Sequence, residues 1–311
     1  MIQTGKRIAC IGECMIEIQA IQENANQEKA IQQRYAGDSL NTAIYLSRLL
    51  SGTTHQVSYV TALGVDRFST DMLAEWQKEG IDCSTVRQIE GALPGLYYVD
   101  TNETGERSFH YWRSQSAAKR LLDGTEFDAQ LDTLIDFDYL YLSGITLAIL
   151  SDDARHKLIR LLEKAKAAQC KIVFDNNYRP TLWQSPAEAR DWYLKLLSIT
   201  DTALLTDDDE YTLWQTSTPD QVFQQYADYN ISEIVLKRGA KPCIIQTIDK
   251  RFTIPARTIA HDKVNSVSYT HLTMPTTKTI NISAVAVILA KKHTQQNKST
   301  TDAGNATEPA H

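Results

Sequence analysis

Short apolar runs alternate with longer amphipathic segments through most of this sequence. The runs predict buried strands at 8–12, 57–64, 139–144, 171–175, 202–205 and 233–237. The centres of the last four lie roughly 32 residues apart, which is the period of successive strand–helix units in a parallel sheet. A further run at 242–247 predicts a returning edge strand. The pattern therefore predicts an α/β fold with a mostly parallel sheet.

Capping residues mark where helices are expected to begin. Asp38 and Ser39 stand just ahead of an apolar face with roughly 3.6-residue spacing, so a helix is predicted to start at one of them. Ser69 is predicted to cap a helix that stops at Gly80. Further helices are predicted to open at Ser151 and at Ser185.

One region departs from this alternation. Residues 96–100 and 107–113 flank the polar sequence Thr104-Gly105-Glu106, a pattern typical of a hairpin. Both stretches are rich in tyrosine, tryptophan and arginine and are too polar for a central parallel strand. We expect this hairpin to leave the main sheet and to cover another part of the molecule.

Composition narrows the class of protein. The length of 311 residues suffices for one large α/β domain or two small ones. A formal net charge of -6 argues against nucleic acid as the main partner. Five scattered cysteines without a Cys-x-x-Cys pair indicate buried thiols in a reducing cytoplasm. No signal peptide and no apolar run of roughly 18–20 residues is visible, so no membrane segment is expected.

Ligands of parallel α/β sheets gather beyond the carboxyl ends of the strands, and the residues expected there are polar. They are Ser143-Gly144, Asp175 to Arg179, Asp207 to Glu210 and Lys237 to Ala240. The chain has no Gly-x-Gly-x-x-Gly after its first strand and no Gly-x-x-x-x-Gly-Lys-Ser/Thr motif. Ordinary dinucleotide binding and P-loop chemistry are therefore not predicted.

Several side chains suit a small acidic ligand. The guanidinium groups of Arg107, Arg113 and Arg179 match a carboxylate, because their forked N–H groups can donate two parallel hydrogen bonds. Tyr97 and Tyr111 can cover the apolar face of such a ligand while offering hydroxyl groups.

Other residues at the strand ends suit a sugar and a phosphate chain. Asp38 and Asn41 suit sugar hydroxyls, and Glu210 suits a hydrated Mg²⁺. Lys237 and Gly239 suit a phosphate chain. Gly37, just before the first helix, allows a ligand to approach the backbone closely.

Each of these groups also has a purely structural interpretation. Residues 175–177 fit an ordinary turn, and Lys237 fits a solvated strand end. The acidic run ending at Glu210 suits the dipole of a helix N-terminus, and Tyr97 with Tyr111 suits cross-strand packing. The residues alone leave these alternatives open.

From residue 6 to about 264 the chain resembles the ribokinase-like (PfkB-type) sugar kinases, and among them the kinases of 2-keto-3-deoxygluconate. The resemblance is carried above all by Ile11-Gly12-Glu13-Cys14-Met15-Ile16-Glu17, Ala36-Gly37-Asp38-Ser39-Leu40-Asn41-Thr42, Tyr111-Trp112-Arg113, Phe174-Asp175-Asn176-Asn177-Tyr178-Arg179-Pro180 and Val235-Leu236-Lys237-Arg238-Gly239-Ala240. The Tyr-Trp-Arg and Asp-Asn-Asn-Tyr-Arg stretches separate this group from its relatives better than the motif around Gly37 does.

The resemblance implies a doubly wound sheet with a small β lid, whose segments lie near 13–36 and 96–113. It implies phosphoryl transfer from ATP, with Mg²⁺, to the 6-hydroxyl of the keto-deoxy sugar acid. The sugar-acid contacts that it implies are Gly37, Asp38, Asn41, Tyr97, Tyr111, Arg113, Asp175 and Arg179. Lys237 and Gly239 would serve the nucleotide, and Glu210 the metal. An assembly of identical subunits through the lid is also expected.

The resemblance breaks off after Val264. The family has Asp-Thr-Thr-(Ala/Gly)-Ala-Gly-Asp there, a turn whose amides stabilise the migrating phosphoryl group and whose last aspartate is the general base. This chain has Asn265-Ser266-Val267-Ser268-Tyr269 instead, and no Gly-Asp pair follows Lys237. We therefore expect a kinase domain over 1–264, an aberrant and partly disordered tail over 265–311, and no general base of the family's kind.

The family resemblance and the missing catalytic turn together leave two possible functions. One is a carbohydrate kinase for the sugar acid, severely impaired as written. The other is a non-catalytic product that still binds the sugar acid. A related PfkB-type kinase, such as a fructokinase, is the alternative on specificity.

Overall fold

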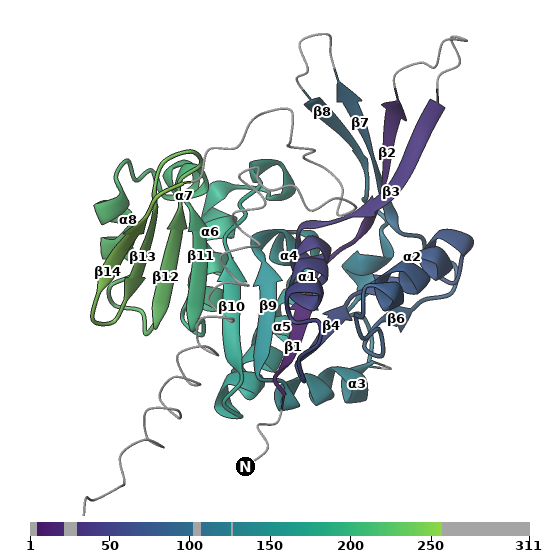
Figure 1. The fold of residues 1–311 in the computed structure, drawn as a ribbon, viewed down its shortest axis with the longest axis horizontal. Coiled ribbons are helices and arrows are strands. Elements are labelled where there is room, and N and C mark those ends of the chain that lie inside the picture. Colours follow the sequence, from purple (N-terminus) through teal and green to yellow (C-terminus); the bar gives the residue numbers. More distant parts are fainter. Residues whose placement is uncertain (1–4, 22–29, 102–106, 126, 257–311) are drawn as a thin grey trace, which may run out of the picture.

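The computed structural model describes residues 5–21, 30–101, 107–125 and 127–256, so the predicted tail over 265–311 lies outside the described residues. At its centre is an eight-stranded sheet with the order β14-β13-β12-β11-β10-β9-β1-β4 (Figure 1). Its strands are β1 (Arg7–Ile11), β4 (Gln56–Val60), β9 (Tyr139–Ser143), β10 (Lys171–Asp175), β11 (Thr202–Thr206), β12 (Glu233–Lys237), β13 (Cys243–Thr247) and β14 (Arg251–Ile254).

The sheet is parallel from β4 to β12, and β13 and β14 are added to it in antiparallel fashion. The prediction of an α/β fold with a mostly parallel sheet is therefore confirmed. The prediction that 242–247 forms the edge is wrong, because β14 pairs with the outer side of β13. The run at 251–254 is short and polar in part, so it gave no strand signal of its own.

Helices cover both faces of the sheet, as a doubly wound arrangement requires. In β1, Ile8 and Cys10 belong to one core cluster and Ala9 and Ile11 to the other, because successive side chains point to opposite faces. The first cluster includes residues of α1 (Asp38–Leu49) and α2 (Arg67–Lys78). The second includes residues of α4 (Gly144–Ile149), α5 (Asp152–Ala167), α6 (Pro186–Leu197), α7 (Asp207–Trp214) and α8 (Pro219–Gln225).

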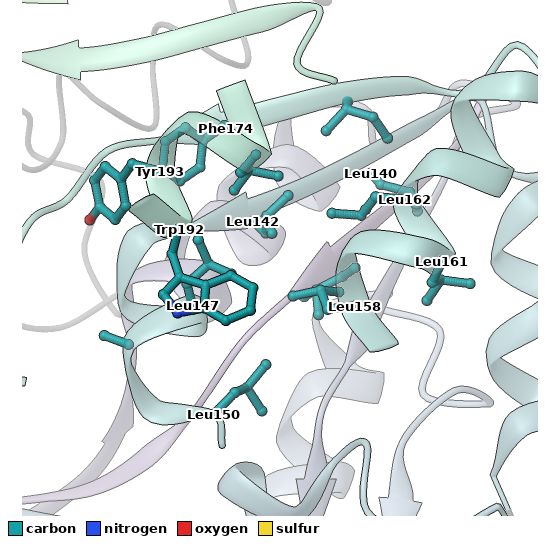
Figure 2. Close-up of a cluster of buried hydrophobic side chains, with 14 of the residues drawn as sticks. Leu140, Leu142, Leu147, Leu150, Leu158, Leu161, Leu162, Phe174, Trp192 and Tyr193 are labelled. Atoms are coloured by element: carbon teal, nitrogen blue, oxygen red, sulfur yellow. The ribbon is translucent and has the colours of Figure 1, made fainter. Parts of the chain in front are cut away.

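Figure 2 shows part of the larger cluster, in which leucines of β9 and α5 lie beside aromatic side chains of β10 and α6. Leu142, Phe174 and Tyr193 in this group are completely buried. Burying each such large side chain contributes roughly 1.5–3 kcal/mol to folding, so this layer anchors the strands whose ends carry the polar residues. The shorter elements are β5 (Ala62–Leu63), β6 (Arg87–Gln88), α3 (Asp128–Asp132), and the 3-10 helices η1 (Ala117–Arg120), η2 (Thr133–Asp136) and η3 (Pro180–Leu182).

The helix starts agree with the sequence in part. Ser151 and Ser185 cap α5 and α6 as predicted. Helix α1 begins at Asp38, but its N-cap is Gly37 and no side chain caps it. The cap predicted at Ser69 is wrong, because α2 starts earlier and Asp66 accepts hydrogen bonds from the amides of residues 68 and 69.

Four strands leave the central sheet and form a second sheet, which we call the lid (Figure 1). Its order is β3-β2-β7-β8, with β2 at Met15–Ile21, β3 at Ala30–Ala36, β7 at Gly95–Thr101 and β8 at Arg107–Trp112. The predicted hairpin is the antiparallel pair β7–β8. None of the helices in the described ranges is long and apolar enough to cross a membrane.

Candidate active site

The lid joins the central sheet at the edge where the parallel strands end (Figure 1). Strand β1 ends at Ile11, and only three residues separate it from β2 of the lid. The polar residues that follow β10, β11 and β12 lie at this same edge, because parallel strands share their direction. The candidate site residues that follow these strands therefore lie at the same end of the sheet.

A buried ion pair links two inner strands at this carboxyl end of the sheet. Nζ of Lys237, at the end of β12, lies 2.9 Å from Oδ1 of Asp175, at the end of β10. The two side chains are 1% and 5% exposed, and the Tyr141 hydroxyl lies 3.4 Å from the other Asp175 oxygen. Charges so far from water persist only when they are paired. The interpretation of Lys237 as a solvated strand end is therefore wrong.

Glu210 is completely buried in the first turn of α7. Its carboxylate accepts hydrogen bonds from the Tyr226 hydroxyl at 2.6 Å and from Nδ2 of Asn176 at 2.9 Å. Burial raises the pKa of Glu210 to about 7, although both hydrogen bonds favour the ionised form. The described residues contain no group of three or more histidine, cysteine, aspartate or glutamate side chains that could hold a metal ion.

The turn after β10 connects that strand to α1. Nδ2 of Asn177 donates a hydrogen bond of 2.7 Å to Oδ2 of Asp38. Asn177 has a φ of 31°, a backbone conformation that asparagine tolerates better than most residues. The side chain of Asn41, one turn along α1, is half-buried and has no hydrogen-bond partner among the described residues.

Gly37 is required by the protein's own backbone. A Cβ atom at this position would lie 2.2 Å from the carbonyl oxygen of Glu13. The sequence led us to expect that a ligand approaches the backbone at Gly37. In the structure the backbone of Glu13 makes this close approach. Gly239, by contrast, has a φ of 57° and open space around the position of a Cβ atom.

Two tyrosines and an arginine lie on one face of the lid. Tyr97 and Tyr111 are paired across β7 and β8 with ring centroids 5.6 Å apart, so the interpretation as cross-strand packing is correct. The Tyr97 hydroxyl donates to the buried carboxylate of Glu17. The Arg113 guanidinium lies 5.8 Å from the Tyr111 ring centroid and forms an ion pair with the buried Glu13.

Arg179 follows strand β10 of the central sheet. Burial raises the pKa of Tyr111, and the positive charges of Arg113 and Arg179 both oppose that rise. Nη1 of Arg179 donates to the Tyr178 carbonyl at 2.7 Å and lies 3.5 Å from Oδ1 of Asp209. Burial raises the pKa of Asp209 to about 6, against the effect of the Arg179 charge. Arg179 is therefore held at the end of the central sheet by Asp209, as Arg113 is held on the lid by Glu13.

Sequence reasoning missed the partners that hold these groups in place. Asn177 and Asp209 were named only as parts of the strand-end stretches, and Glu13 and Tyr226 were given no role. The four bind residues that were singled out: Asn177 binds Asp38, Asp209 binds Arg179, Glu13 binds Arg113 and Tyr226 binds Glu210. Glu13 and Asn177 stand within the stretches that carry the family resemblance, which was the available signal. The side chain of Arg107 lies outside the part of the chain that the structure describes.

Residues 6–268 match the sequence profile of the pfkB family carbohydrate kinases. The chain belongs to this family. It is 43% identical over 262 residues to the 2-dehydro-3-deoxygluconokinase of Dickeya dadantii (strain 3937), which covers 84% of this chain and 83% of that protein. The protein of the same name from Escherichia coli (strain K12) is 43% identical over 260 residues, covering 83% and 82%.

Solved structures give the same fold. The PfkB protein from Polaromonas sp. JS666 superimposes with a TM-score of 0.71 at 27% identity, covering 82% of this chain and 84% of that one. A fructokinase from Xylella fastidiosa, solved with bound ATP, gives a TM-score of 0.67 at 24% identity and covers 82% and 75%. The expected ribokinase-like fold, with its lid, is thereby confirmed for this pfkB-family kinase.

Proposed function

We propose that this pfkB-family chain binds 2-keto-3-deoxygluconate, also named 2-dehydro-3-deoxygluconate, and ATP at the edge between the central sheet and the lid. The observation that carries the proposal is the placement of two arginines that protein carboxylates hold: Arg113 lies beside Tyr111 on the lid, and Arg179 follows β10 of the central sheet. A pair of guanidinium groups suits a carboxylate, which a sugar acid has and a neutral sugar lacks. The 43% identity to proteins named for this substrate supports it.

The remaining substrate contacts follow from the same geometry. Asp38 and Asn41, in the first turn of α1, offer an acceptor and an amide to sugar hydroxyls. Nδ2 of Asn177 donates to Asp38 at 2.7 Å, and Tyr97 and Tyr111 form an aromatic pair on the lid. Asp175 is engaged by Lys237, so its contribution to the sugar is through the arrangement of this edge.

ATP is the proposed phosphoryl donor, as membership of a kinase family implies. The open space at Gly239, beyond the end of β12, leaves room for a phosphate chain. Glu210 would face the Mg²⁺ that accompanies the phosphates through water, because its two oxygens already accept bonds from Asn176 and Tyr226. Lys237 would act on the nucleotide through its charge, since its ammonium group is paired with Asp175.

We further propose that the transfer step itself is severely impaired. Moving the terminal phosphoryl group of ATP to the sugar's 6-hydroxyl requires a base for the hydroxyl proton and donors for the migrating group. The family's turn that provides both follows the position of Val264, and this chain has Asn265 to Tyr269 there. The function supported best is therefore recognition of substrate and nucleotide with little turnover.

Isothermal titration calorimetry with 2-keto-3-deoxygluconate tests the recognition step. Arg113→Ala and Arg179→Ala should each weaken binding by about 1.5–3 kcal/mol, which is typical of a hydrogen bond to a charged group. Fructose, a neutral ketose, serves as the comparison ligand and separates a fructokinase from a sugar-acid site. Equal affinity of the wild type and both variants for the sugar acid would remove the arginines from the site. Tighter binding of fructose would favour the fructokinase alternative.

Two further proposals concern the oligomeric state of the enzyme and its location in the cell. Exposed side chains on the lid, among them Ile31 and Trp112, favour an assembly of identical subunits through the lid. Sedimentation at several concentrations of wild type and Trp112→Ser would test it. The five cysteines are free, which agrees with the reducing cytoplasm proposed as its location.

A further inference from the structure

Glu13 lies where the chain passes from β1 of the central sheet into the lid. Its side chain is 1% exposed, and its Oε2 atom accepts a hydrogen bond from Nη2 of Arg113, whose side chain is 13% exposed. Among the described residues, Glu13 is the only hydrogen-bonding partner of the Arg113 side chain. The orientation of the guanidinium group thus depends on a carboxylate 100 residues earlier in the chain.

Glu13 is itself held on two sides. Its carbonyl oxygen lies so close to Gly37 that a Cβ atom there would approach to 2.2 Å. Its Oε1 atom lies beside Gly95, where a Cβ atom would approach to 3.1 Å. The start of α1 and the start of β7 therefore both close on this residue. A side chain packed in this way is a fixed anchor for its partner.

The contact uses only part of the guanidinium group. Nη2 of Arg113 donates to Glu13, whereas its Nε atom is buried and has no hydrogen-bond partner within the described ranges. A guanidinium group has five N–H donors, and those on Nη1 have no partner within the described ranges, so they remain for a second acceptor. The carboxylate of Glu13 also compensates the positive charge of Arg113, because an unpaired buried cation would be costly.

We propose that Glu13 is a positioning residue, which orients Arg113 toward the carboxylate of the sugar acid and so sets the preference for an acid over a neutral sugar. This inference rests on the proposed function. An arginine side chain loses considerable rotational freedom when it is immobilised by a ligand. Because Glu13 fixes Arg113 beforehand, the ligand's carboxylate meets an ordered group.

A competing effect has the opposite sign. Glu13 carries the same charge as the ligand's carboxylate and repels it, so removing Glu13 could in principle tighten binding. The contact through Nη2 alone leaves the rest of the guanidinium group for the ligand, which favours the positioning effect. The sign of the change in affinity therefore decides between the two.

The experiment compares two ligands that differ only at C1: 2-keto-3-deoxygluconate and 3-deoxyfructose, its neutral counterpart. Affinities are measured by calorimetry for the wild type, Glu13→Ala, Glu13→Gln, Arg113→Ala and the double variant Glu13→Ala/Arg113→Ala. Glu13→Ala should weaken binding of the sugar acid by about tenfold or more and leave 3-deoxyfructose unchanged. Glu13→Gln should retain most of the affinity, because its amide oxygen still accepts a hydrogen bond from Arg113.

The double variant should bind the sugar acid no more weakly than Arg113→Ala, since Glu13 acts through Arg113. Glu79→Gln is the matched control, because Glu79 pairs with Arg48 on α1 and touches none of the proposed sugar contacts. Equal losses for both ligands in Glu13→Ala would indicate general loss of packing and overturn the inference. Tighter binding of the sugar acid would overturn it as well.

A readout without ligand separates this inference from the proposed function. The ¹⁵Nε–¹Hε NMR signal of Arg113, assigned with Arg113→Ala, reports whether the guanidinium group is ordered in the free protein. It should be preserved in Glu13→Gln and be lost or broadened in Glu13→Ala, and an unchanged signal in both would overturn the positioning role. If the wild type binds neither ligand while the signal behaves as expected, the proposed substrate is wrong and Glu13 still positions Arg113.

Discussion

Glu210 and Asp209 are neighbouring acidic residues at the start of α7, and each has lost much of its contact with water. Burial raises the pKa of Glu210 to about 7 and that of Asp209 to about 6. The helix dipole and the hydrogen bonds from Asn176 and Tyr226 stabilise the ionised form, but they do not compensate fully for the lost hydration. These residues therefore link the protonation of the site to the stability of the fold.

The pH dependence of stability provides a test at Glu210. Its pKa in the folded state, about 7, exceeds the ordinary value of 4.5, so the folded state binds the proton more tightly than the unfolded state does. As the pH rises from 4.5 to 7, stability is lost. Glu210→Gln cannot ionise, so its free energy of unfolding should exceed that of the wild type by about 3 kcal/mol at pH 8 and by little at pH 4.5.

Urea unfolding at the two pH values measures this difference. Glu79→Gln, at a partly exposed ion pair, is the control and should show no comparable dependence on pH. A stability difference between Glu210→Gln and wild type that is constant from pH 4.5 to pH 8 would contradict the raised pKa. At pH 4.5 Glu210 is protonated, so the variant is compared with a neutral side chain. The hydrogen bond that the carboxylate accepts from Tyr226 at pH 8 already contributes to the folded-state pKa.

Among the elements, strands β10 and β12 are tied together across β11 by the ion pair of Asp175 and Lys237. Replacing one partner of a buried ion pair leaves the other charge without compensation, whereas replacing both partners leaves no buried charge. Lys237→Met should therefore lower the free energy of unfolding by about 3–5 kcal/mol, and Lys237→Met/Asp175→Leu should lose clearly less.

Lys6→Met gives a matched comparison for the single variant. Lys6 pairs with Asp138 at 2.6 Å, but the two side chains are 53% and 28% exposed, so its loss should cost less than about 1 kcal/mol. Chemical denaturation of the three variants and the wild type is the measurement. If Lys237→Met is as stable as Lys6→Met, the pair at the strand ends contributes little to the fold.

The sequence predicts elements better than it predicts contacts. The central strands were predictable because both of their faces are buried, which leaves continuous apolar runs such as 171–175. Strand β14 was missed because all four of its residues are exposed. The links of Glu13 to Arg113 and of Asp38 to Asn177 span 100 and 139 residues, and no local pattern signals such distant pairs. The family resemblance assigned roles to the arginines Arg113 and Arg179, but none to the residues Glu13 and Asp209 that hold them.

For the molecule as a whole, the described part combines a well-packed centre with a sparsely covered margin. Residues 234–236 of β12 are buried, but β13 is only half-buried and β14 is exposed, with Phe252 at 48% and Ile254 at 39%. Exposed apolar side chains at a sheet margin favour association with other chains. The proposed sugar contacts Asp38 and Arg179 lie away from this margin, at the start of α1 and after the central strand β10, where packing is complete.

The turnover number tests the proposed impairment of the transfer step. A positioned general base contributes roughly 10²–10⁴-fold and one oxyanion-type donor roughly 10²–10³-fold. If the two effects are independent, the sequence after Val264 predicts a deficit on the order of 10⁴–10⁷-fold against an intact relative. Purified protein with ATP, Mg²⁺ and 2-keto-3-deoxygluconate should therefore yield almost no phosphorylated sugar.

The Escherichia coli relative, assayed in parallel, provides the active reference. A turnover number near 1 s⁻¹ or above, within the usual range of enzymes, would mean that another residue supplies the base. Asp175 and Asp207 would then be the first to replace, because both are buried carboxylates at the strand ends of this site. Loss of that turnover in Asp207→Asn, with sugar-acid binding retained, would assign the base to Asp207 and refute the proposed impairment.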